Sequence, residues 1–93
     1  MRMPMKKKKT KIPQRLIEKC ALVLIEWVDS SYALGWQTGD GEPQLKRCSS
    51  VGWIRKASED AITLTANMTI EEPPQRCCEI TIPRCAIRRV HKL

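Results

Sequence analysis

Residues 61–68 carry the feature that most constrains the fold of this chain, a strict alternation of apolar and polar side chains. Four apolar residues alternate there with three polar ones, in the order Ile62, Thr63, Leu64, Thr65, Ala66, Asn67 and Met68. Because successive side chains of an extended strand point to opposite faces, this spacing predicts a strand whose apolar residues share one buried face.

Two further segments before residue 61 predict strands that can pair with it. Residues 21–28 are apolar on both faces and rich in strand-forming side chains, which favours an internal position in a sheet. A second strand is predicted over about residues 45–57. Gly52 inside this strand marks a sharp bend or the close approach of another backbone.

The C-terminal part predicts two more strands, at residues 77–82 and 87–93. Between them, residues 83–86 predict a tight turn that begins with a proline. The first of these two strands is expected to point three side chains into the core: Cys78, Ile80 and Ile82.

Other kinds of structure are predicted before and between the first two strands. Residues 12–19 can form one or two helical turns, with Pro13 suited to the first helical position. Residues 29–43 are rich in turn-forming side chains and predict a long loop that exposes Tyr32 and Trp36.

Together these elements predict a mainly β fold: a small five-stranded antiparallel barrel of the SH3-like or Sm-like kind, preceded by a short N-terminal helix. The expected organisation is a flexible basic arm at residues 1–11 and a single small β-barrel domain at residues 12–93. A chain of 93 residues has a thin core. We therefore expect the protein to form a homo-oligomer.

The net positive charge is concentrated at the N-terminus. Residues 1–20 hold eight basic side chains against Glu18 alone, a balance of +7, whereas residues 21–93 hold nine basic and nine acidic side chains. Half of the eight basic residues form one lysine run: Lys6, Lys7, Lys8 and Lys9. Such an arm can bind phosphates with release of counterions. A solubilising tail accounts for the same composition equally well.

A second basic cluster follows Glu79, after which the chain has no acidic residue. The cluster predicts a phosphate-binding patch of four side chains: Arg84, Arg88, Arg89 and Lys92. Arginine suits this role because its guanidinium can bind a phosphate with two parallel hydrogen bonds and can stack on bases. Tyr32 and Trp36 are candidate aromatic contacts for a ligand. Trp27 and Trp53 lie inside predicted strands, which favours contacts in the core or between subunits.

The cysteines and the one histidine form no recognisable catalytic or metal-binding pattern. Five cysteines are present without a C-x-x-C pair, so reduced thiols are expected rather than disulfides or a zinc site. Cys85 beside Arg84 lacks a positioned base, and His91 is close to the C-terminus in a basic context. We therefore expect no enzymatic activity, no metal and no cofactor.

The hydropathy pattern predicts no membrane segment. The longest apolar run, Cys20 to Ile25, is far shorter than the about 20 residues that a membrane-spanning helix needs. No apolar signal-peptide core follows the basic N-terminus. A cytoplasmic location is the expectation.

The segment from Ile80 to Val90, with the pattern I-x-I-P-R-x-A-I-x-x-V, resembles the end of small Sm-like barrels, which include the Hfq-type RNA chaperones of bacteria. The pattern over about residues 20–93 also resembles small phage and prophage proteins of unassigned function. The chain departs from Hfq at the corner before the fifth strand, where Arg84-Cys85 replaces a lysine-histidine pair. No uridine-binding residue is therefore carried over.

Two functional hypotheses follow from these observations. In the first, the protein is a phage-encoded, oligomeric module that binds nucleic acid or a nucleotide, such as a host immune signalling nucleotide, in the cytoplasm of the bacterial host. In the second, it is a protein-interaction module or an inhibitor of a host protein, with residues 29–43 as the contact.

Overall fold

The computed structural model describes residues 10–30, 36, 38, 39, 41 and 45–93. In chain order the elements are α1 (Gln14–Glu18), β1 (Leu22–Asp29), β2 (Lys46–Ala57), β3 (Ala61–Met68), β4 (Arg76–Pro83), the 3-10 helix η1 (Arg84–Ala86) and β5 (Ile87–Lys92). The mainly β class, the five strands and the short helix are confirmed, with strand boundaries within one or two residues of those predicted.

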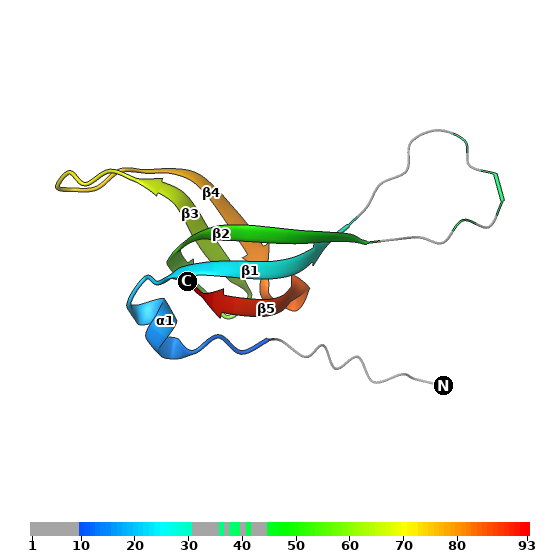
Figure 1. Cartoon of the computed structure of the whole chain (residues 1–93), viewed down its shortest axis with the longest axis horizontal. Coiled ribbons are helices and arrows are strands. Elements are labelled where there is room, and N and C mark those ends of the chain that lie inside the picture. The colour runs from blue at the N-terminus through cyan, green and yellow to red at the C-terminus, as the bar shows by residue number, and fades with distance from the viewer. Residues whose placement is uncertain (1–9, 31–35, 37, 40, 42–44) are drawn as a thin grey trace.

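The five strands form one antiparallel sheet with the order β4-β3-β2-β1-β5 (Figure 1). The internal position predicted for the first strand is confirmed, because β1 pairs with β2 on one side and β5 on the other. The two edge strands, β4 and β5, follow each other in sequence and are joined by η1. η1 is the tight turn predicted at residues 83–86.

Gly52 in β2 lies close to the backbone of β3. A Cβ atom at this position would be 2.8 Å from the Thr65 carbonyl oxygen and 3.1 Å from Leu64 Cβ. Real Cβ atoms do not approach a backbone oxygen so closely, so only glycine fits without a shift of one strand. The close backbone approach predicted at Gly52 is confirmed.

The core is formed by side chains of all five strands and of the N-terminal helical segment. Its buried apolar side chains are Ile12, Leu16, Val23, Ile25, Ile54, Ile62, Leu64, Ile82 and Ile87. Pro13 is the residue before the first helical one, not the first helical residue that the sequence predicted.

The burial predicted for β3 is only partly correct. Ile62 and Leu64 are buried as predicted, but Ala66 and Met68 are exposed, and Thr63 and Thr65 on the opposite face are buried. The reason is tertiary: the β3–β4 hairpin extends past the other strands (Figure 1), so its end has no partner layer to cover it. The single hydroxyl hydrogen of Thr65 can be donated to the carbonyl oxygen of Asn67, at 3.3 Å, or to that of Cys77, at 3.4 Å.

The inward orientation predicted for β4 is confirmed for Ile82 and Ile80, which are opposite the buried Ile62 and Leu64. Ile82 is fully buried, but Ile80 is 37% exposed and Cys78 is exposed. Cys78 also has a left-handed backbone, with φ of 65°. β4 is an edge strand that pairs only with β3, so the part that belongs to the projecting hairpin remains open to solvent.

Candidate functional site

A bulge in β5 brings two arginines to the surface side by side. Arg89 is opposite Glu26, whereas the next pair along β1 is Trp27 with Ile87, so Arg88 is an extra residue in β5. In a regular strand one of two consecutive side chains would face the core. The bulge changes the direction in which the following side chains point. As a result, both Arg88 and Arg89 are exposed, whereas Ile87 is buried.

The other two residues of the predicted patch lie at the ends of this segment. Arg84 is in η1, half-buried, and its Nε donates a hydrogen bond of 2.8 Å to the Ser58 carbonyl oxygen. Lys92 is exposed at the end of β5, opposite Val23. Arg84 therefore has a structural role at the corner, and the exposed charges of the patch are on β5.

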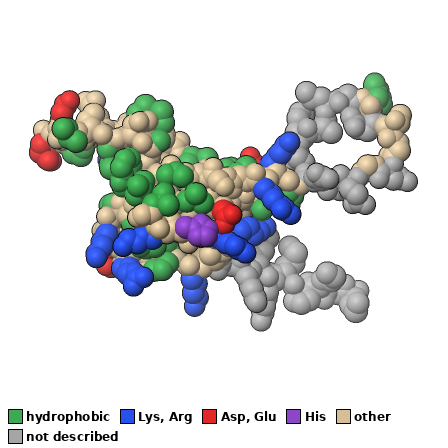
Figure 2. All heavy atoms as spheres, viewed as in Figure 1, with side chains coloured by type: hydrophobic (Ala, Val, Ile, Leu, Met, Phe, Trp, Pro, Cys, Tyr) green, Lys and Arg blue, Asp and Glu red, His purple; other side chains and the backbone are tan. Residues whose placement is uncertain are grey.

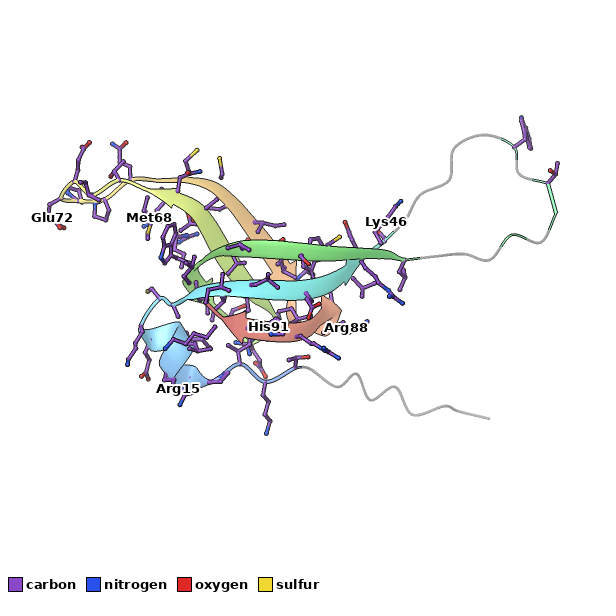
Figure 3. The ribbon with its side chains drawn as sticks, in the orientation of Figure 1. Arg15, Lys46, Met68, Glu72, Arg88 and His91 are labelled. Carbon is purple, nitrogen blue, oxygen red and sulfur yellow. The ribbon has the colours of Figure 1, made fainter. Side chains whose placement is uncertain are left out.

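Arg88 uses only part of its hydrogen-bonding capacity within the protein. Its Nη1 donates to the carbonyl oxygen of Cys85 at 3.0 Å and lies 3.5 Å from that of Ile87. A guanidinium carries five N–H donors on three nitrogens, so Nη2 and Nε remain for an anion. These internal bonds fix the side chain beside η1 and β5, where Figure 3 shows it.

Thr10 connects the N-terminal segment to the same strand. Its hydroxyl group donates a hydrogen bond of 2.9 Å to the Ile87 carbonyl oxygen, across 77 residues of sequence. Thr10 directly follows the lysine run, whose members Lys6, Lys7, Lys8 and Lys9 lie outside the described residues. The described part of the chain therefore begins beside Ile87, the residue that precedes Arg88.

Glu26 places one negative charge on the same face of the sheet as Arg89. Its carboxylate is 2.8 Å from Nε2 of His91. The pKa of Glu26 is lowered, mainly by this hydrogen bond and also by the charges of His91 and Arg89, against a smaller opposing effect of burial. Figure 2 shows the single histidine, in purple, beside an acidic group and between basic side chains.

Arg47 belongs to this face too, and the sequence alone did not single it out. It is exposed in β2 and opposite Val28, two residues along β1 from Glu26, so it shares the face with Arg89. We define the basic face as Arg47, Arg88 and Arg89, with the Glu26–His91 pair between its strands. Lys92 is opposite the buried Val23 and therefore lies on the other face of the sheet. Neither the Glu26–His91 pair nor Arg47 has a local sequence signal, because strand register brings them together.

The described tryptophans lie as the sequence indicated: two are half-buried in strands and one is exposed. Trp27 is half-buried and packs against the core, and its Nε1 donates a hydrogen bond of 2.9 Å to the Ser50 hydroxyl group. Trp53 is half-buried in β2. Trp36 is fully exposed, at 101%. Tyr32 lies outside the described residues.

Among the residues that the structure describes, no group of three or more His, Cys, Asp or Glu side chains could hold a metal ion. The same part of the chain contains no helix of the length and hydropathy needed to cross a membrane. Comparisons of the chain with protein-family models, with curated proteins and with solved structures found no match.

Proposed function

We propose that the protein is a non-enzymatic, phage-type binding module that binds nucleic acid or a nucleotide through β5 and the preceding lysine run. The observation that carries this proposal is the hydrogen bond between Thr10 and Ile87. It places Thr10, the residue that follows the lysine run in sequence, beside the β5 residue that precedes Arg88. We expect the lysines to contact the same phosphate-bearing ligand as Arg88 and Arg89.

The chemistry of the basic face supports phosphate as the recognised group. Arg88 and Arg89 are adjacent and exposed, and the internal hydrogen bonds of Arg88 lower the entropy that its side chain loses on binding a pair of phosphate oxygens. Each cation that neutralises a nucleic-acid phosphate releases counterions and adds affinity that falls with salt. The exposed ring of Trp36 is available for base stacking.

The proposed fold is an Sm-like or SH3-like barrel that assembles into a homo-oligomer in the cytoplasm of the bacterial host. Support comes from the helix followed by five strands, the close approach at Gly52 and the one-turn corner between the last two strands. β4 and β5 each have one edge without a partner strand in the sheet. Pairing of β4 in one copy with β5 in the next would satisfy both edges.

The test is fluorescence anisotropy of a labelled single-stranded RNA at constant salt. Arg88→Glu with Arg89→Glu should abolish binding, because two charges change sign at the proposed phosphate contact and the net charge falls by four. The matched control is Lys19→Glu with Lys56→Glu, which changes the net charge equally at exposed positions outside β5. Glu26→Gln should strengthen binding, since it removes the acidic group opposite Arg89. Equal affinity of the Arg88/Arg89 variant and the parent would contradict the proposal.

A second candidate function is a protein-interaction module, and the full exposure of Trp36 favours it. An aromatic side chain in such a position is typical of interface hot spots. Most of the 29–43 segment lies outside the described residues, so this candidate depends on Trp36 alone. Salt separates the two functions: a protein interface centred on Trp36 should keep its affinity as salt rises, whereas phosphate binding should lose it.

A further inference from the structure

Cys77 and Cys78 form a pair of exposed thiols on the edge strand β4, away from the basic face. Their Sγ atoms are 3.2 Å apart. In a regular strand, consecutive side chains point to opposite faces, which keeps adjacent sulfurs apart. A local departure from strand geometry must therefore bring these two sulfurs into contact.

That departure is at Cys78. Its φ is 65°, a left-handed conformation that, among the described residues other than glycine, only Cys20 shares. The β3–β4 ladder keeps one register from Ala61–Pro83 to Met68–Arg76, but the pair that would contain Cys78 is missing from it. Residues other than glycine rarely adopt this left-handed backbone conformation. At Cys78 the conformation accompanies the contact between the two thiols.

We propose that Cys77 and Cys78 are a redox-active dithiol, which a small disulfide oxidises to a ring disulfide between the two neighbouring residues. One cysteine thiolate attacks a sulfur of the small disulfide, forms a mixed disulfide and releases the first small thiol. The second cysteine thiolate attacks the protein sulfur of the mixed disulfide and releases the second small thiol. The protein loses two electrons and two protons, and the small disulfide gains them.

The geometry favours the second step over persistence of the mixed disulfide. The sulfurs must approach each other by only about 1.1 Å to reach the S–S bond length of about 2.05 Å. Cα atoms joined by a trans peptide are about 3.8 Å apart, below the usual range for disulfide partners. Because such a ring is strained, we expect thiols to reduce it readily. Easy reduction is typical of reversible disulfides and not of structural ones.

A structural metal site is a poorer fit for the same pair. Structural zinc takes four ligands, and no third His, Cys, Asp or Glu ligand joins these thiols within the described part of the chain. The pKa of Cys77 is raised, mainly by its hydrogen bond with the Cys78 thiol. Thiolate is the attacking species, and a raised pKa lowers the fraction of thiolate at neutral pH. The exchange is therefore best measured at about pH 8, which is closer than neutral pH to the ordinary thiol pKa of about 8.5.

The test is incubation of the full-length protein with glutathione disulfide, followed by intact mass spectrometry and peptide mapping without reduction. The expected product has a peptide from β4 that is lighter by two hydrogens, is not alkylated at Cys77 or Cys78 and carries no glutathione. Reduced glutathione in excess should restore both thiols. A stable glutathione adduct on either cysteine, a disulfide to another cysteine, or two unreacted thiols would each overturn the proposal.

Single substitutions provide the second arm. Cys77→Ser and Cys78→Ser each leave one attacking thiol and no resolving thiol, so each should accumulate the glutathione adduct that the parent does not retain. The background is Cys20→Ser with Cys48→Ser and Cys85→Ser, which removes the remaining cysteines. The site is on β4 and the basic face is on the opposite edge of the sheet, so a negative result here leaves the proposed function untouched.

Discussion

Arg88 occupies a position that a regular strand does not provide. As the extra residue of the β5 bulge, it is exposed next to Arg89, which makes a two-arginine surface possible on an edge strand. Glu26 and His91 moderate the charge of the same face through their mutual hydrogen bond. At this scale, strand register decides which charges meet.

Gly52→Ala should lower the free energy of unfolding by about 1–3 kcal/mol, the usual cost of overpacking. The added Cβ would be 2.8 Å from a backbone oxygen, so β2 or β3 must shift. Urea denaturation measures the effect. Gly41→Ala is the control, since a Cβ there meets nothing within 4 Å and the change should be within about 0.5 kcal/mol. Equal stability of both variants would contradict the close approach of the strands.

Glu26→Gln should lower stability in a pH-dependent way. The pKa of Glu26 is lowered in the folded protein, so its contribution is present above its ordinary value of 4.5 and is lost as the pH falls through the lowered folded pKa. The gap in unfolding free energy between parent and variant should therefore close on acidification. Denaturant unfolding across this pH range measures the gap, with Glu18→Gln on α1 as the control. A gap that widens towards low pH would contradict the Glu26–His91 pair.

At the scale of elements, α1 and the edge strands depend on tertiary contacts. A helix of five residues has no independent stability, so α1 persists because Leu16 is buried against the sheet together with Ile12. The strands were predictable because apolar patterning over six to twelve residues is local information. The exposure of Ala66 and Met68 was not, because it depends on how far the hairpin extends past its neighbours.

Leu16→Ala should cost about 2–5 kcal/mol of unfolding free energy, the range for truncation of a buried leucine. Leu16 is 6% exposed and is the buried residue of α1. Arg15→Ala, at an exposed position of the same helix, is the matched control and should change little. Thermal or urea unfolding of both variants measures the difference. A loss below about 0.5 kcal/mol for Leu16→Ala would mean that α1 does not cover the core.

At the scale of the whole molecule, two long-range contacts define the candidate site. Glu26 and His91 are 65 residues apart, and Thr10 and Ile87 are 77 residues apart. The sequence indicated both basic clusters through local charge. The contact between Thr10 and β5 depends on the sheet order and on the path of the chain into α1, and no local pattern contains that information.

The proposed assembly through β4 and β5 predicts a homo-oligomer at micromolar concentration. Unpaired strand edges favour pairing with another copy, and a small core gains stability from it. Sedimentation velocity over a concentration series measures the state, and hydrogen exchange should show protected amides on both edge strands. A monomer throughout the series would contradict the assembly.

The salt dependence of RNA binding tests the central claim most directly. The slope of log affinity against log salt is compared between the parent and the variant with Lys6, Lys7, Lys8 and Lys9 all changed to glutamine. Each lost phosphate contact on a single strand lowers the slope by about 0.7. If all four lysines bind phosphates beside β5, the variant's slope should be smaller by about 3. Affinity that does not respond to salt, or equal slopes for parent and variant, would contradict phosphate recognition by the lysine run and β5 together.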